Sequence, residues 1–266
     1  MPYATNGTIT ANILIHEHIY RMEIECADIA KEAKPGQFIQ IRTSDHLMPL
    51  LNRPISIARI KDNRIEIIYA VVGEGTKNLC EMKTGATVSM VGPLGHGFET
   101  NLSREKVLLV GGGMGVAPLH ALAEVLYAQG CEIDTILGFN RQEDIFSDKE
   151  FEHWSNNVYV TTMDGSCGIH GHACTPLDRH LSIYDYRHIY ACGPQPMLHA
   201  LGKICNEHHI DCSLSVEEYM ACGIGVCLGC VQPIRDKAGS ISYQRVCVEG
   251  PVFSSREVVY DDELGH

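Results

Sequence analysis

Four cysteines in the C-terminal part of the chain have a spacing that could hold an iron–sulfur cluster. They follow the pattern C-x4-C-x2-C, with a fourth thiol after a gap of sixteen residues: Cys222, Cys227, Cys230 and Cys247. This is the plant-type [2Fe-2S] pattern, in which four thiolates hold two irons. Gly223, Gly225 and Gly229 lie among these cysteines. Because glycine permits positive φ and leaves room for backbone N–H groups to approach sulfur, these glycines favour a chain wrapped around a cluster.

Two other interpretations of the same cysteines remain open. A structural zinc site also uses four cysteines, usually as two separated C-x2-C pairs, and this stretch has one such pair. Alternatively, the thiols could be buried and pack as small hydrophobic groups. Three cysteines separated by glycines would pack poorly in a core, so the spacing favours the iron–sulfur cluster over both alternatives.

Composition and charge limit the class of protein. The 266 residues include 33 acidic and 21 basic side chains, a formal net charge of −12, so we expect no nucleic-acid partner and no membrane surface. There is no apolar run of about 18 residues, and no basic N-terminal region precedes an apolar stretch. We therefore expect neither a membrane span nor a signal peptide. Twelve cysteines without a disulfide framework favour a reducing compartment, and we expect a cytoplasmic protein.

Short runs of alternating or β-branched residues fill the first hundred positions. Six of these runs have the pattern of strands: 7–15, 19–26, 36–42, 55–60, 64–72 and 87–92. Turn-forming residues separate several of them, as expected of an antiparallel barrel or sandwich. A short helix is predicted to begin at Gly75, between the fifth and sixth strands. A helix N-terminus preceded by glycine can hold a phosphate.

The pattern changes near residue 105. Residues 106–110 form a continuous apolar run typical of a buried parallel strand, and the glycine-rich turn 111–118 follows at once. A helix is predicted over 119–129, and further strands over 133–139, 158–162 and 187–192, the last ending in Cys192-Gly-Pro. Such alternation indicates a parallel, nucleotide-binding α/β domain. The glycines fit G-x-G-x-G rather than G-x-G-x-x-G, so a tight turn without a ligand remains the alternative.

The chain is thus predicted to contain three parts. A β-barrel occupies residues 1–100, a nucleotide-binding α/β domain 101–212, and a small cluster module 213–266. In the last part, two strand-like runs at 231–234 and 240–246 flank a turn and predict a hairpin that returns Cys247 to the other three thiols. With few apolar residues of its own, the module is expected to depend on its metal centre for folding.

Several stretches carry a resemblance to a known family: Arg53-Pro-Ile-Ser56, Gly73-Glu-Gly-Thr76, 111–118, Asp164-Gly-Ser166, Cys192-Gly-Pro194, 217–230 and 247–253. Together they resemble the electron-transfer subunit of class 1B dihydroorotate dehydrogenase, in the ferredoxin-NADP reductase superfamily. The match covers nearly the whole chain. Arg-Pro-x-Ser marks only the superfamily, whereas the cluster motif with its Gly-Pro-Val-Phe tail is specific.

The resemblance implies that the barrel holds FAD and the α/β domain NAD(H). The residues implied for FAD are Arg53, Pro54, Ile55, Ser56, Ile68, Tyr69, Ala70, Gly75 and Thr76, with the Arg53 guanidinium on the pyrophosphate. Those implied for NAD(H) are Gly111, Gly112, Gly113, Gly115, Cys192 and Gly193. NADH is favoured over NADPH, although Arg141 follows the second α/β strand closely enough to meet a 2′-phosphate. Without the resemblance, a surface or turn arginine before proline is the favoured interpretation of Arg53. Cys192 is equally well a small residue that fits a crowded strand end.

The implied function is electron transfer. A nicotinamide gives two electrons together, a [2Fe-2S] cluster accepts one at a time, and a flavin can do both. The expected partner is the FMN-containing catalytic subunit that oxidises dihydroorotate to orotate, in a heterotetramer of two copies of each subunit. No catalytic residue for that oxidation is predicted in this chain. The alternatives are the small FAD/[2Fe-2S] subunit of a ferredoxin:NADP oxidoreductase or sulfide dehydrogenase, a flavin and cluster redox sensor, and a zinc-stabilised binding module.

Overall fold

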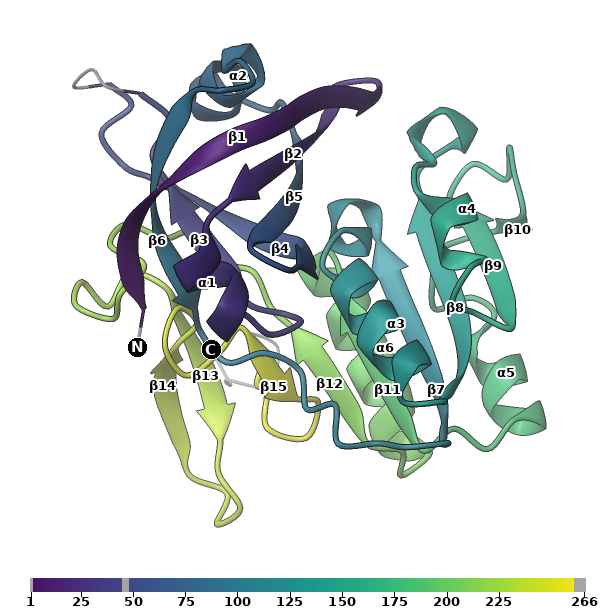
Figure 1. Cartoon of the computed structure of the whole chain (residues 1–266). Coiled ribbons are helices and arrows are strands. Elements are labelled where there is room, and N and C mark those ends of the chain that lie inside the picture. Colours follow the sequence, from purple (N-terminus) through teal and green to yellow (C-terminus); the bar gives the residue numbers. More distant parts are fainter. Residues whose placement is uncertain (1, 45–47, 261–266) are drawn as a thin grey trace.

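The computed structural model describes residues 2–44 and 48–260. Its strands form a closed barrel, a seven-stranded sheet and a two-stranded hairpin. Figure 1 shows the barrel beside the sheet, with the hairpin below the barrel. None of the helices in the described ranges is long and apolar enough to cross a membrane.

Six antiparallel strands close the barrel in the order β1-β2-β5-β4-β3-β6. Their bounds are Tyr3–His16 (β1), Ile19–Glu25 (β2), Phe38–Ile41 (β3), Arg53–Lys61 (β4), Arg64–Ala70 (β5) and Thr87–Leu94 (β6). Alternation along the strands places Ile39, Ile41 and Ile67 in a core inside the barrel. The six predicted strands are therefore confirmed. Helix α2 (Glu74–Glu81) lies where a helix was predicted, whereas α1 (Ala27–Glu32) was not anticipated.

The sheet has the order β10-β9-β8-β7-β11-β12-β15. Its strands are β7 (Lys106–Gly112), β8 (Glu132–Phe139), β9 (Asn157–Thr162), β10 (Ile169–His170), β11 (His188–Cys192), β12 (Cys212–Ser215) and β15 (Val252–Ser254). All neighbouring strands are parallel except β12 and β15. The parallel nucleotide-binding architecture predicted from the alternating pattern is present.

Helices cover both faces of the sheet, which explains the continuous apolar run in β7. Val107 and Leu109 pack in the core that includes α3 residues, and Leu108 and Val110 pack in the core that includes α6 residues. The helices are α3 (Leu119–Ala128), α4 (Asp148–Phe151), α5 (Leu177–Ile183) and α6 (Gln195–Glu207), with short 3-10 turns at Gly113–Val116 and Gln142–Asp144. A strand buried on both faces needs apolar side chains at every position.

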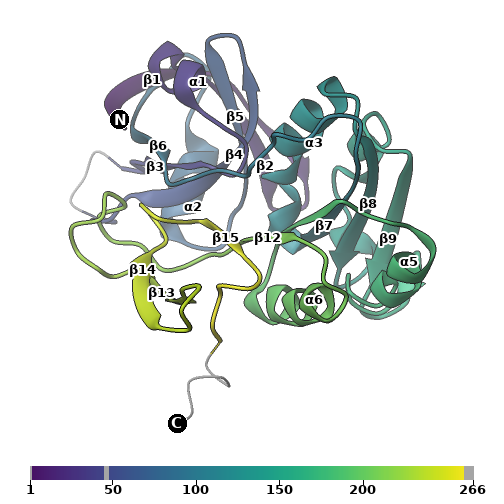
Figure 2. The ribbon, with the colours of Figure 1, turned by 90° about the horizontal axis from the view of Figure 1, so that it is seen from below.

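The C-terminal part of the chain is joined to the sheet rather than separate from it. Strand β12 pairs with β11, and the chain then passes through the cysteine loop and the hairpin before β15 pairs with β12. The predicted hairpin is present as β13 (Val231–Arg235) and β14 (Ile241–Arg245). Figure 2 shows β15 beside β12 and the hairpin away from the sheet. The boundary at 212/213 stays a prediction, although the sheet continues across it.

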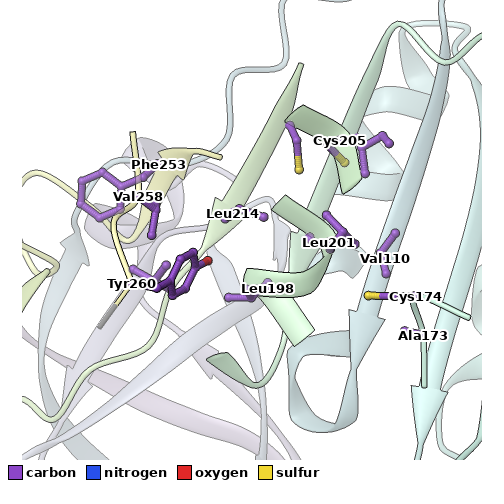
Figure 3. Packing of buried hydrophobic residues seen from close by; sticks show 14 of the residues in the cluster. Val110, Ala173, Cys174, Leu198, Leu201, Cys205, Leu214, Phe253, Val258 and Tyr260 are labelled. Atoms are coloured by element: carbon purple, nitrogen blue, oxygen red, sulfur yellow. The ribbon is translucent and has the colours of Figure 1, made fainter. Parts of the chain in front are cut away.

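The core on the α6 face connects the sheet to this C-terminal segment. Figure 3 shows Leu198 and Leu201 of α6 beside Leu214 of β12, with Tyr260 near Leu198 and Phe253 and Val258 farther from the helix. The same cluster of buried side chains includes Phe38 of the barrel and the cluster cysteines Cys230 and Cys247. One apolar core therefore runs from the sheet to the barrel through the cysteine region.

Candidate cofactor sites

A cavity of about 310 Å³ lies where the three parts of the molecule meet. Its barrel wall is formed by residues predicted to bind FAD: Pro54, Ile55, Ser56, Ile68, Tyr69, Ala70 and Thr76. Met114 and Ala117, which belong to the glycine-rich turn after β7, line the side formed by the sheet. Met220 and Pro251, which flank the cluster cysteines in sequence, line a third side. A single hollow therefore touches the predicted flavin, nicotinamide and cluster regions.

The remaining two residues predicted for FAD, Arg53 and Gly75, lie against each other at the N-terminus of α2. A Cβ placed on Gly75 would lie 2.5 Å from Arg53 Nε. The Arg53 Nη1 group also donates a hydrogen bond to the Leu51 carbonyl at 2.6 Å. A guanidinium beside the first turn of a helix suits a phosphate, because both present N–H donors and positive charge. These residues fit the pyrophosphate of FAD.

Two predicted flavin residues use their side chains within the protein. The Thr76 hydroxyl accepts a hydrogen bond from Val72 N at 2.9 Å and so closes the turn before α2. The Tyr69 hydroxyl donates to Asn12 Oδ1 at 3.0 Å, with the ring buried in the barrel core. Any contact of either residue with a flavin stays a prediction, and for Tyr69 it would involve the backbone.

The residues predicted for NAD(H) meet at the carboxyl edge of the sheet. Cys192 of β11 pairs with Gly111 of β7. A Cβ on Gly115 would lie 2.3 Å from the Cys192 carbonyl oxygen and 2.5 Å from Gly193 N, so only glycine fits there. Gly113 has a φ of +53° and open space around its Cα. Two backbone turns therefore leave room for a ligand at the edge where α/β folds bind nucleotides.

The Cys192 thiol is 1% exposed at this edge. Burial raises its pKa well above the ordinary value for a thiol, with an adjacent carboxyl, Glu217, acting in the same direction. The thiol is therefore neutral. Its environment matches that of a small side chain at a crowded strand end.

The four predicted cluster thiols lie in two pairs. The Cys227 backbone N–H donates to Cys222 Sγ at 3.4 Å, and the Cys230 and Cys247 thiols interact with each other, each 2% exposed. Two pairs of thiols suit two irons, each held by two sulfurs. In the described part of the chain, no three His, Cys, Asp or Glu side chains form a group suited to a single metal ion. The donor set fits a [2Fe-2S] cluster.

The backbone around Cys222 favours its thiolate form. Partial burial tends to raise the thiol pKa, but N–H groups of Cys227, Ile224 and Val226 hydrogen bond to the sulfur and lower that pKa to about 6. At the other pair, burial and the neighbouring Cys230 thiol raise the pKa of Cys247 to about 12. Near neutral pH, iron binding would therefore displace a proton from Cys247, whereas the Cys222 thiol is already largely ionised.

An ion pair supports the cysteine loop from the hairpin side. Arg245 Nη1 donates to the Gly225 carbonyl at 3.0 Å, and the Glu249 carboxylate accepts from Arg245 Nε at 3.0 Å. Hydrogen bonds from Arg245 lower the pKa of Glu249 and keep it charged. The loop conformation is thus fixed by a residue on β14 as well as by its own glycines.

Sequence analysis missed one wall of the cavity. Ser215, Val216 and Glu217 line it at the end of β12, a strand too short to be recognised from its residues alone. Desolvation by the surrounding protein raises the pKa of the Glu217 carboxyl, which lines the cavity.

A second, larger hollow of about 890 Å³ lies on the barrel near Asn6 and Arg42. Its described lining contains none of the predicted cofactor residues.

Comparisons with known proteins agree with this layout. Residues 217–259 match the family described as the iron-sulfur cluster binding domain of dihydroorotate dehydrogenase B, and residues 109–203 match the oxidoreductase NAD-binding domain. Among solved structures, that of an NADH-dependent reduced ferredoxin-NADP oxidoreductase has a TM-score of 0.83 and 30% identity, covering 97% of this chain and 91% of that chain. A ferredoxin reductase of carbazole 1,9a-dioxygenase shares the fold, with a TM-score of 0.66 at 20% identity over 79% of this chain and 67% of its own.

Two curated relatives align with this chain over nearly their whole length, and both have the same name. The protein from Caldanaerobacter subterraneus subsp. tengcongensis is 40% identical over 260 residues, covering 98% of this chain and 100% of its own. That from Bacillus cereus is 39% identical over 249 residues, covering 92% and 94%. Both are named dihydroorotate dehydrogenase B (NAD(+)), electron transfer subunit. This chain belongs to the family of dihydroorotate dehydrogenase B electron transfer subunits.

Proposed function

We propose that this chain carries electrons between NAD(H) and an FMN-containing catalytic subunit that oxidises dihydroorotate to orotate, using FAD in the cavity and a [2Fe-2S] cluster on the four cysteines. The observation that carries the proposal is the single cavity whose walls come from the barrel, the glycine turn after β7, and the segments that flank the cluster thiols. Bound FAD supplies the conversion between two-electron nicotinamide chemistry and one-electron cluster chemistry.

The chain's own residues position these groups and exclude water. Arg53 and the first turn of α2 hold the pyrophosphate, while Pro54, Ile55 and Ser56 provide a strand edge for the ring. Gly115 lets the glycine turn lie directly on the Cys192–Gly193 backbone. Met114 and Ala117 of the same turn line the cavity, so this edge would hold the nicotinamide beside the flavin site. Met220 and Pro251 line the cavity and flank the cysteines in sequence, so their apolar side chains would exclude water on the side of the cavity that leads to the cluster.

The partner is proposed to dock over the cysteine loop. Exposed apolar side chains surround the cluster thiols: Tyr219 (93% exposed), Ile224 (50%), Val226 (76%) and Leu228 (63%). Apolar side chains clustered on a surface mark an interaction site. Cys227 is exposed within this group, so a docked flavoprotein would lie close to the cluster. We propose the assembly to be a heterotetramer of two copies of each subunit.

NADH is the proposed nicotinamide. The Arg141 guanidinium, which follows β8, already lies 3.4 Å from Asp144 Oδ1 and 4.0 Å from Glu143 Oε2. Two carboxylates beside this arginine oppose a further 2′-phosphate. Comparing kcat/KM for NADH and NADPH tests this point, and a preference for NADPH would contradict it.

The twelve cysteines, all free thiols among the described residues, support a reducing and hence cytoplasmic location. Fractionation of the native host with an antibody against the chain would test this. Recovery from an oxidising compartment would contradict it.

Reconstitution with the catalytic partner tests the proposed function. The chain and the FMN protein are mixed, and dihydroorotate-dependent reduction of NAD⁺ is measured together with complex mass. We expect turnover only with both proteins. Val226→Asp should weaken complex formation about tenfold or more by placing a charge in the apolar contact, whereas Ile183→Asp, on exposed α5 far from the loop, should have no effect. A chain that neither binds the partner nor couples the two reactions would contradict the proposal.

A further inference from the structure

Gln40 of strand β3 carries a buried amide that has no hydrogen-bond partner in the part of the chain that the structure describes. Its side chain is 1% exposed, and within the described residues neither Nε2 nor Oε1 forms a hydrogen bond. Leaving a buried polar group unpaired costs about 1–3 kcal/mol, so such groups usually contact something that completes them.

The amide points toward the cysteine loop. Alternation along β3 turns Ile39 and Ile41 into the barrel core, and it turns Phe38 toward the core that contains Cys230 and Cys247. Gln40 lies on the same side of the strand as Phe38. A Cβ placed on Gly223, the residue after Cys222, would lie 2.4 Å from Gln40 Cγ and 2.7 Å from Nε2. The amide therefore lies directly beneath the backbone that wraps the cluster site.

Two other glutamines in this part of the molecule, one buried and one partly buried, have hydrogen-bond partners. Gln232 of β13 is 3% exposed, and its Nε2 donates to the Val259 carbonyl at 3.0 Å. Gln37, three residues before Gln40, donates to the Gly95 carbonyl at 2.6 Å. Among these three glutamines, only Gln40 lies beside Cys222, and among the described residues both polar atoms of its amide lack a partner.

We propose that Gln40 Nε2 donates a hydrogen bond to a sulfur of the cluster or of its Cys222 ligand, and that this bond raises the reduction potential of the cluster. Hydrogen bonds to cluster sulfurs stabilise the reduced state, because it carries one more negative charge. Gln40 is then a positioning residue, contributed by the flavin barrel, that sets how readily the cluster takes an electron. The inference rests on the cluster of the proposed function but not on the identity of the partner.

A redox titration followed by electron paramagnetic resonance tests this role. Gln40→Leu removes the donor at similar volume, and Gln232→Leu removes a paired buried amide from the cluster module as the matched control. At a fixed ambient potential, the reduced-to-oxidised ratio of the cluster should fall about three- to tenfold in Gln40→Leu, as expected for one hydrogen bond, where tenfold equals 59 mV for one electron. The flavin potential in Gln40→Leu and the cluster potential in Gln232→Leu should be unchanged.

A measurement on the wild-type protein tests the same hydrogen bond even if Gln40→Leu fails to assemble its cluster. With glutamine labelled by ¹⁵N in its side chain, pulsed resonance of the reduced cluster should detect an amide nitrogen coupled to it. An unchanged cluster potential in Gln40→Leu, or a wild-type cluster without this coupling, would overturn the role of Gln40 alone. Wild-type protein with no [2Fe-2S] cluster by iron and sulfide assay would overturn the proposed function as well.

Discussion

The barrel meets the rest of the molecule at two joints of different character. Toward the helices of the nucleotide domain the joint adds charges to an apolar contact: Glu150 of α4 binds Arg21 at 2.5 Å and also Arg59, both on barrel strands, while Ala58 and Ile68 of the barrel share a buried core with α3. Toward the cysteine module the joint is apolar, with Phe38 and Leu94 of the barrel in one core with Cys230, Cys247 and Phe253. We call these the charged joint and the apolar joint.

The two joints hold different parts of the proposed electron path in place. A partly exposed ion pair contributes little net stability and weakens with salt, whereas a close-packed apolar core is not weakened by charge screening. We therefore infer that the apolar joint holds the flavin-to-cluster geometry, and that the nicotinamide side, where ion pairs add to the apolar contact, is the part whose stability responds more to pH and salt. Four experiments test this difference between the joints.

Removing a cluster ligand should have the largest effect. Cys247→Ala deletes a thiol of the buried pair, so iron content and electron delivery to the partner should fall to background. Reduction of FAD by NADH should remain within about twofold of wild type, because the charged joint is untouched. Iron assays and stopped-flow spectra measure the two quantities, with Cys80→Ala as the control. Loss of NADH-driven flavin reduction in Cys247→Ala would show that the joints are not independent.

Truncating the apolar joint should have the next largest effect. Phe253 is 6% exposed, and Phe253→Ala should lower the free energy of unfolding in urea by about 3 kcal/mol through the cavity it leaves. Ile241 on the hairpin is 43% exposed, and Ile241→Ala should cost less than about 0.5 kcal/mol. Equal costs for the two variants would argue against a continuous core through the cysteine region.

The charged joint should weaken in acid. Burial lowers the pKa of His120 from 6.5 to about 4, with the nearby Arg59 adding to the shift and Glu150 opposing it. Below pH 6.5 the unfolded chain binds a proton that the folded chain does not, so stability falls as pH falls toward 4. Between pH 7 and 5 this one group should account for about 2 kcal/mol. This pH-dependent loss of about 2 kcal/mol in stability should be absent in His120→Gln. It should be retained in the control His172→Gln, because His172 is exposed. Identical pH profiles for wild type and His120→Gln would refute it.

Deleting the central carboxylate should have the smallest effect. Glu150→Gln leaves Arg21 and Arg59 beside a neutral amide, and these arginine side chains are only 20% and 17% exposed. We expect a loss of about 1 kcal/mol that shrinks as salt is added, and slower flavin reduction by NADH. Glu152→Gln, at an exposed position just after α4, is the control. A salt-independent loss would mean that the contact is not primarily electrostatic.

Patterns local in sequence predicted much of this molecule. The cysteine spacing placed Cys222, Cys227, Cys230 and Cys247 in one region, and strand periodicity found the six barrel strands and the central strands of the sheet. Such signals work because a cluster needs fixed ligand spacing and a strand needs period-two alternation.

Features that depend on distant partners were not predictable. Strand β15 has three residues and is defined only by pairing with β12. Arg21, Arg59 and Glu150 are ordinary surface charges until the two domains meet. Gln40 resembles any strand glutamine, and its isolation becomes visible only once the cysteine loop covers it. The charged joint and the proposed hydrogen bond from Gln40 to the cluster both depend on contacts between segments that are far apart in the sequence.

An anaerobic visible spectrum during titration with NADH tests the electron path most directly, with iron, sulfide and flavin assayed on the same sample. We expect about two irons and one FAD per chain, with NADH bleaching both the flavin and the iron–sulfur bands. A colourless protein that contains zinc, or a cluster that stays oxidised while the flavin is reduced, would contradict it.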